Sequence, residues 1–148
     1  MATKVKDLLQ KKGSDVICIN QEATIYDTVK TLVKQNIGAV LVLDENEKLV
    51  GIFTERDSLK QTVRRSDRLK ETRVRDVMTT DLIIGLPDDD SEYLMGIMTS
   101  NKVRHIPILE DGKVMGIISI GDLVKTQLHD VQYENRYLKD YIMGKYPA

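Results

Sequence analysis

Two short stretches of the sequence each place an aspartate three positions after a hydroxyl residue that ends an apolar run. Thr54 and Asp57 form the first pair, and Ser119 and Asp122 form the second. An apolar run that stops at Ser or Thr indicates a short buried strand leading into a helix. The start of a helix offers free backbone N–H groups and a positive dipole end, where an anion can bind. Two copies of the pattern predict two such places.

The same spacing is also typical of a helix capping pair. A Ser or Thr cap with an Asp in the first turn is stabilised by backbone N–H groups and the helix dipole, without any ligand. Both roles are compatible, because an anion can use the N–H groups that the cap leaves free. From these residues alone, capping is the better interpretation.

The other residue types that often carry chemistry do not form a recognised set. His105 and His129 are the only histidines, and Cys18 is the only cysteine, so no metal-ligand spacing is present. No nucleophile and base stand in a known catalytic pattern. The acidic run Asp88–Asp90 precedes an expected helix and is interpreted as a solvated cap. We therefore expect no metal site, no required cofactor and no enzyme activity.

Composition excludes several classes of function. The chain has 148 residues and a net charge of −1, without the basic excess of a nucleic-acid surface. It has no tryptophan and only 5% aromatic residues, so it offers few side chains on which nucleic-acid bases could stack. One cysteine fits a reducing compartment. The first residues lack the apolar core of a signal peptide, and no segment is long enough to span a bilayer. The expectation is a cytoplasmic protein without membrane contact.

The chain contains an internal repeat. Thr3–Leu9 matches Thr72–Met78, Asp15–Ile17 matches Asp81–Ile83, and Gly51–Lys60 matches Gly116–Lys125. The blocks keep their order and nearly their spacing, except that the first copy has three extra residues around Lys11–Gly13. Such agreement indicates duplication of one structural unit.

Each copy predicts the element order β-α-β-β-α after a short helical turn. The fold class is therefore α/β (α+β), with two pseudo-symmetric repeats packed as one module, in which the short strands could share a core. The expected bounds are residues 4–65 for the first domain, 72–126 for the second, and 127–148 for a C-terminal amphipathic helix and tail. The expected elements are turns at Val5–Gln10 and Val74–Met78, strands at Val16–Ile19 and Leu82–Ile84, helices at Ile25–Gln35 and Ser91–Ser100, and strand pairs at Ala39–Leu43 with Leu49–Phe53 and at Ile106–Leu109 with Val114–Ile118.

With the repeat laid out, the chain resembles a pair of CBS (cystathionine-β-synthase) domains forming a stand-alone module. The resemblance rests on the order and double occurrence of several blocks, namely Asn36–Val40, Gly51–Asp57, Val74–Met78, Val103–Ile108 and Gly116–Asp122. It implies two clefts between the repeats and a disc-shaped homodimer. It also implies an adenosine-containing ligand: AMP, ADP, ATP, S-adenosylmethionine or a nicotinamide dinucleotide.

The resemblance also assigns roles to residues. Asp57 and Asp122 match the aspartate that accepts hydrogen bonds from the ribose hydroxyls of the ligand. Thr54 and Ser119 match the hydroxyl residue near its phosphate, at the helix N-terminus. Positions that match the adenine-flanking first strand and the segment lining a cleft are Val16, Ile17, Leu82, Ile83, Ala39, Arg104, His105, Ile106 and Pro107. The first copy lacks the Arg, His and Pro of the second, while Arg56 has Gly121 as its counterpart. We therefore expect unequal sites, and if only one cleft is filled, we expect it to be the one at Ser119 and Asp122.

Two functions remain open on the sequence. One is a regulatory module that binds an adenosine nucleotide and signals to a separate partner protein. The alternative is a homodimeric scaffold whose clefts are empty or weakly used. The resemblance favours the regulatory module.

Overall fold

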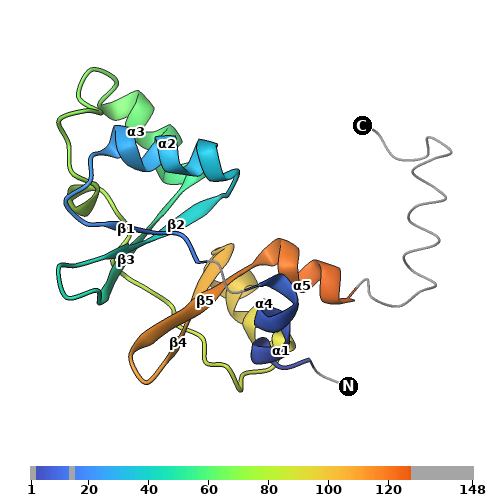
Figure 1. Ribbon diagram of the computed structural model, residues 1–148. Helices are drawn as coiled ribbons and strands as arrows, with labels where there is room; N and C mark the ends of the chain where they lie inside the picture. Colours follow the sequence, from blue (N-terminus) through green and yellow to red (C-terminus); the bar gives the residue numbers. More distant parts are fainter. Residues whose placement is uncertain (1–2, 14–15, 128–148) are drawn as a thin grey trace, which may run out of the picture.

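The computed structural model describes residues 3–13 and 16–127 and has two units joined side by side (Figure 1). The first unit contains a three-stranded sheet of β1 (Cys18–Asn20), β2 (Ala39–Leu43) and β3 (Leu49–Thr54). Strand β1 is parallel to β2, and β2 is antiparallel to β3. Helices α2 (Ile25–Gln35) and α3 (Glu55–Arg64) cover one face of this sheet.

The second unit repeats the arrangement with a smaller sheet. Strands β4 (His105–Glu110) and β5 (Lys113–Ser119) form an antiparallel pair, and α4 (Ser91–Asn101) and α5 (Ile120–Gln127) pack on it. The predicted α+β fold of two similar repeats is thereby confirmed. The C-terminal helix predicted for residues 127–148 lies, apart from its first residue, outside the described residues.

Local sequence explains where the helices begin and how the strands turn. The Thr24 hydroxyl accepts a hydrogen bond of 3.1 Å from the Asp27 N–H, which caps α2. Ile25 and Leu32 then fall on the buried face of α2 because their spacing follows the helical period. The turn between β4 and β5 places Asp111 and Gly112 at positive φ, as the Asp-Gly pair predicts.

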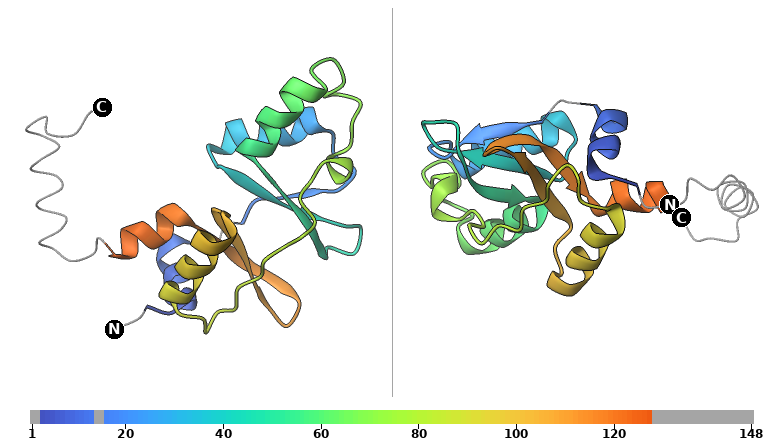
Figure 2. Two further views of the ribbon diagram at one scale, coloured as in Figure 1. Left: turned by 180° about the vertical axis from the view of Figure 1, so that it is seen from behind. Right: turned by 90° about the horizontal axis from the view of Figure 1, so that it is seen from below.

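The repeats exchange their N-terminal turns. Helix α1 (Val5–Lys12) belongs to the first repeat in sequence but lies with α4, α5 and β5 of the second unit in all views (Figures 1 and 2). The 3₁₀ turn η1 (Val74–Asp76) belongs to the second repeat, yet Val74 is buried in the core of the first. The backbone contacts correspond: Val5 N–H donates to Asp89 O at 2.9 Å, and Val74 N–H donates to Ala23 O at 2.7 Å.

The strand predicted at Leu82–Ile84 is wrong, because no strand forms there. Only a single parallel bridge joins Gly85 to Ile108. In the first repeat, Leu41 N–H donates to Ile17 O at 3.3 Å beside β1. The residue equivalent to Leu41 is Pro107, which has no N–H, so this ladder hydrogen bond is lost and the strand does not extend. The first strand of the first repeat does form, but it spans Cys18–Asn20 and not the predicted Val16–Ile19.

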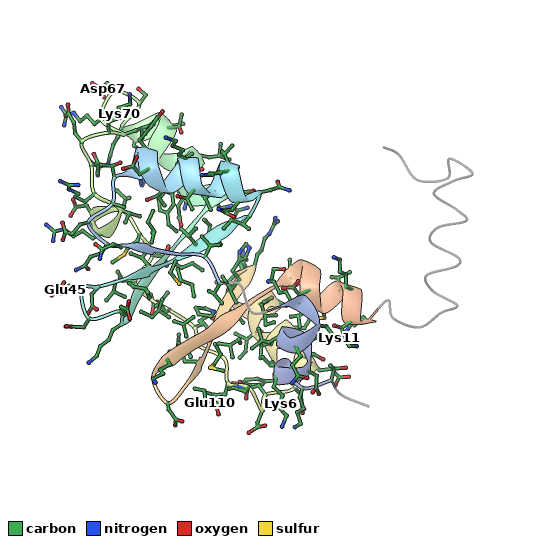
Figure 3. The ribbon with its side chains drawn as sticks, in the orientation of Figure 1. Lys6, Lys11, Glu45, Asp67, Lys70 and Glu110 are labelled. Atoms are coloured by element: carbon green, nitrogen blue, oxygen red, sulfur yellow. The ribbon has the colours of Figure 1, made fainter. Side chains whose placement is uncertain are left out.

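The charged segment between the repeats is mostly exposed, as its composition predicts. Asp67 and Lys70 lie in it, beyond the end of α3 and away from the second unit (Figure 3). Among the described residues, no helix has both the length and the apolar character needed to cross a membrane.

Candidate ligand site between the repeats

Ser119 and Asp122 stand where β5 ends and α5 begins. Asp122 Oδ2 accepts a hydrogen bond of 2.8 Å from the Ser119 N–H, and Ser119 Oγ accepts one of 3.1 Å from the Asp122 N–H. The two residues therefore form a reciprocal cap that fixes the carboxylate at the helix start. The Asp122 side chain is about one-fifth exposed, so a ligand can still reach it.

Thr54 and Asp57 form the same reciprocal cap at α3. Asp57 Oδ2 accepts from the Thr54 N–H at 3.0 Å and from the Thr54 hydroxyl at 3.1 Å, and Thr54 Oγ1 accepts from the Asp57 N–H at 3.2 Å. The helix capping that the sequence predicted for these pairs is thus present at both places. It does not decide whether the carboxylates also bind a ligand, because the other carboxylate oxygen makes no hydrogen bond with a described residue at either place.

Lys12 is a third charged residue at the second place and comes from the exchanged helix α1. Its Nζ lies 2.7 Å from Asp122 Oδ2 and also donates to the Ile117 carbonyl at 2.8 Å. Burial alone would raise the pKa of Asp122, but the hydrogen bonds from Lys12 and Ser119 outweigh it and lower the pKa. Asp122 is therefore held ionised.

His105 lies at the opposite end of the β4–β5 pair from the hairpin, with Ser119 as its Cα partner. Its imidazole faces the first repeat, since a Cβ built on Gly38 would lie 3.4 Å from His105 Nε2 and 3.7 Å from Glu55 Oε1. Burial lowers the pKa of His105, and the positive charge of Lys12 lowers it further, against the opposing effect of Asp122 and Glu55. His105 is therefore held neutral between the two repeats.

Beside these polar groups, an apolar cluster joins the two units. Ala39, Leu41 and Ile52 of the first sheet are buried there, and Val114 and Ile117 of β5 pack against them. Val16 and Leu82, two of the residues predicted to flank adenine, complete the cluster from equivalent places in the two repeats. The structure thus brings three predicted site residues, Val16, Leu82 and Ala39, to the boundary between the units.

Three other predicted site residues turn their side chains towards the separate cores. Ile17 packs against the core of the first unit and Ile83 against that of the second. Ile106 is fully buried in the second core. Pro107 is also buried, but it pairs with Ile117 across the sheet and therefore lies on the face of β4 that meets the apolar inter-repeat cluster. The side chain of Ile106 is therefore withheld from a ligand, whereas those of Ile17 and Ile83 are half-buried.

The two basic residues predicted at the clefts are exposed. The Arg104 carbonyl accepts a hydrogen bond of 2.9 Å from the Ile120 N–H, and the Gly38 carbonyl accepts one of 3.0 Å from the Glu55 N–H. Arg104 and Gly38 are therefore structural equivalents, and only the second repeat carries a cation at this position. Arg56 lies in the first turn of α3, where the second repeat has Gly121. The two places therefore differ in their basic residues, and unequal binding at them stays a prediction.

Three further features of the structure were compared with the candidate site: possible metal ligands, Cys18 and a cavity in the second unit. Within the described ranges, no three His, Cys, Asp or Glu side chains are grouped to hold a metal ion. Cys18 is half-buried in the apolar cluster, and burial raises the pKa of its thiol. A cavity of about 200 Å³ lies between α4 and α5, lined by residues such as Ser91, Met95 and Leu123, and it includes none of the predicted site residues.

The sequence analysis missed Lys12, Ile117 and Glu55. A signal for Lys12 was present, because it belongs to the three residues that the first repeat has in excess. The extra length continues α1 beyond the point where the equivalent turn η1 ends, which brings Lys12 to the other repeat. The contact between Lys12 and Asp122 cannot be inferred from the sequence unless it is known that α1 packs on the second unit.

Comparison with known proteins agrees with the two-repeat architecture. The family model described as CBS domain matches twice, at residues 5–59 and 74–129. A CBS domain-containing protein of Arabidopsis thaliana, CBSX3, mitochondrial, is 35% identical over 98% of this chain and 74% of its own length.

Solved structures are similar in the same way. The CBS-domain containing protein ATU1752 from Agrobacterium tumefaciens is 40% identical, covers 86% of this chain and 95% of its own, and has a TM-score of 0.81. The CBS domain pair of protein MJ0100, solved with 5′-methylthioadenosine and S-adenosyl-L-methionine, is 26% identical over 85% of this chain and 96% of its own, with a TM-score of 0.75. The two matches of the family model, together with the 35% identity to CBSX3, show that the chain belongs to the CBS domain family and carries two CBS domains.

Proposed function

We propose that this CBS pair is a regulatory module that binds an adenosine-containing ligand between its repeats and transmits the binding event to a separate protein. The observation that carries the proposal is the capped pair Ser119 and Asp122, which holds an ionised carboxylate beside the apolar inter-repeat cluster. A carboxylate accepts hydrogen bonds from ribose hydroxyls, and an apolar surface favours a flat base. These are the two chemical halves of adenosine.

A related pair gives the ligand class independent support. The MJ0100 pair was solved with 5′-methylthioadenosine and S-adenosyl-L-methionine, both of which contain adenosine. For the present chain the class extends to AMP, ADP, ATP and nicotinamide dinucleotides, because Lys12 contacts Asp122, Arg56 precedes Asp57 in the sequence and Arg104 precedes His105.

The second place is the stronger candidate. Lys12 contacts Asp122, and the charge of Asp122 acts on His105, whereas the first repeat has Gly38 where the second has Arg104. We therefore propose that the cleft at Ser119 and Asp122 fills first. Ligand binding there would bridge both units, because His105 and Glu55 come from different repeats and lie close together.

Regulation requires that the ligand bind one arrangement of the repeats more tightly than another. A partner protein, or a second copy of the chain in a homodimer, would then respond to the favoured arrangement. Sedimentation velocity with and without nucleotide separates a permanent dimer from one that forms on binding.

The central test is thermal unfolding with AMP, ATP, NAD and S-adenosylmethionine for the wild type, Asp122→Asn and Asp57→Asn. Asparagine keeps an oxygen for the cap and removes the charge. A ligand at a hundredfold excess over its dissociation constant stabilises the folded state by about 2.7 kcal/mol. We expect the stabilisation to be lost in Asp122→Asn and largely kept in Asp57→Asn.

Two outcomes would overturn parts of the proposal. No stabilisation by any adenosine ligand would favour the scaffold function. Stabilisation that survives both substitutions would remove the ribose role from the aspartates while keeping ligand binding. Mass spectrometry of small molecules that co-purify with the protein identifies the ligand without a prior choice.

A further inference from the structure

Lys12 replaces, in the second unit, a contact that the backbone makes in the first. In the first unit, the Ile52 carbonyl accepts a hydrogen bond of 3.0 Å from the Thr79 N–H, beside the exchanged turn η1. The equivalent carbonyl in the second unit is that of Ile117, and it accepts from Lys12 Nζ at 2.8 Å. The Lys12 ammonium is therefore anchored to the strand, independently of its ion pair.

The two capped aspartates consequently differ in charge environment. Asp122 Oδ2 is 2.7 Å from Lys12 Nζ, whereas among the described residues Asp57 has no ion pair. The Lys12 side chain is 38% exposed, so an anionic group of a ligand can approach its ammonium.

We propose that Lys12 is a specificity-determining residue that makes the second cleft prefer adenosine ligands carrying an anionic group, such as a phosphate, over uncharged nucleosides. This inference rests on the proposed function, and it names the ligand class of that same site.

The argument concerns what happens to the ion pair when ribose arrives. Ribose hydroxyls are neutral donors, and hydrogen bonds to a carboxylate from a cation are stronger than those from neutral groups. An uncharged nucleoside that displaces Lys12 from Asp122 leaves a partly buried ammonium without its anion, which is unfavourable. A nucleotide supplies a replacement anion, because the displaced ammonium stays near the site through the Ile117 carbonyl.

Specificity is a difference between two affinities, so the ratio of two dissociation constants is the quantity to measure. We would titrate adenosine and AMP into the wild type, Lys12→Met, Lys12→Gln and Lys12→Arg, following the His105 ring signals by NMR. These signals report the second cleft locally, and the His105→Gln variant assigns them. The wild type should bind AMP more tightly than adenosine.

We expect this preference to fall by about tenfold in Lys12→Met and Lys12→Gln, the loss of one charge-assisted hydrogen bond. Lys12→Arg should retain it. Lys11→Met is the matched control, because Lys11 is the exposed neighbour on α1 (Figure 3) and forms no ion pair with a described residue. It removes the same charge from the same helix end and should leave the preference unchanged.

An unchanged preference in Lys12→Met and Lys12→Gln, or an equal loss in Lys11→Met, would overturn the inference while leaving the proposed function intact. If neither adenosine nor AMP shifts the wild-type signals, the proposed function itself fails at this cleft and the inference fails with it. Lys12→Gln keeps N–H donors for the Ile117 carbonyl, so the test does not depend on the methionine variant folding.

Discussion

The side chain of Leu9 lies against Gly116, although the two residues belong to different repeats. A Cβ at Gly116 would overlap Leu9, and a Cβ at Gly51 would overlap Met78 in the equivalent contact. Leu9 and Met78 occupy matching positions in the two exchanged turns. The glycines of β3 and β5 therefore allow each turn to reach the sheet of the other repeat.

Gly116→Ala should destabilise the protein by about 1–3 kcal/mol, because the added methyl group overpacks the contact with Leu9. The free energy of unfolding is measured by urea titration. Gly96→Ala is the control, since a Cβ there meets nothing within 4 Å. Gly96 lies in α4, where alanine should stabilise by up to about 1 kcal/mol. Equal and small effects of the two substitutions would contradict the close packing.

Leu8→Ala should weaken the second unit rather than the first, because Leu8 is buried among residues of α4, α5, β4 and β5. Leu→Ala in a core costs about 2–5 kcal/mol. Hydrogen exchange should therefore speed up mainly at the amides of β4 and β5. Val74→Ala is the mirror experiment and should affect β2 and β3. If each substitution instead affects the repeat to which it belongs in sequence, the exchange of turns is not present in solution.

Thr54→Ala and Ser119→Ala should each cost about 1 kcal/mol of stability, because each removes the hydroxyl that accepts from the aspartate N–H. Chemical denaturation compares both variants with Thr62→Ala. Among the described residues, the Thr62 hydroxyl bonds only to the Ser58 carbonyl inside α3, and Thr62 is exposed, so loss of the hydroxyl should be nearly neutral. A neutral Thr54→Ala would argue against the cap.

The wild type should lose stability as the pH falls below about 6.5, the ordinary pKa of histidine, because of His105. His105→Gln should not show this loss. Burial and the charge of Lys12 lower the pKa of folded His105. Between the two pKa values the unfolded chain binds the proton and the folded chain does not, so acid favours unfolding. Urea midpoints at pH 7.5, 6 and 5 measure the effect. Asp122 acts at lower pH, because its lowered pKa gives stability above about pH 3.9 that is lost as pH falls through the folded value. Identical pH slopes for wild type and His105→Gln would refute the assignment.

Lys12→Met should raise the pKa of His105. The substitution removes a cation that opposes protonation and leaves the Asp122 carboxylate, which favours it, without a neutralising partner. A pH titration of the His105 ring signals in the ligand-free protein measures the shift. His129, which lies outside the described residues, supplies a second histidine signal for comparison. No change in Lys12→Met, or an equal change in Lys11→Met, would show that Lys12 does not sit beside Asp122 in solution.

Much of the architecture follows from local sequence. Thr54 and Ser119 end apolar runs and do cap helices, and the Asp111–Gly112 pair does form the expected hairpin turn. These features depend on residues close together in the chain, so their physics is visible in a short window. The pairing of the two carboxylates with hydroxyl caps was predictable for the same reason.

What could not be predicted depends on contacts between distant residues. Nothing in the spacing of Val5 and Leu8 specifies that their apolar face meets α4 and α5 rather than the sheet of the same repeat. The position of Lys12 at Asp122 depends on that contact. The absence of a strand at Leu82–Ile84 could have been predicted, because Pro107 has no N–H to donate where Leu41 donates one. That prediction requires the two residues to be recognised as equivalent.

The exchange of turns also bears on how such a pair arises. A single repeat whose N-terminal turn packs on a neighbouring sheet lacks part of its own core, since Val74 fills a place in the first unit and Val5 fills the matching place in the second. One repeat alone therefore completes itself only by trading turns with a second copy. Duplication and fusion would join two already interlocked partners into one chain. After fusion each half can diverge, and an insertion as small as Lys11–Gly13 in one turn alters the site at the end of the other half.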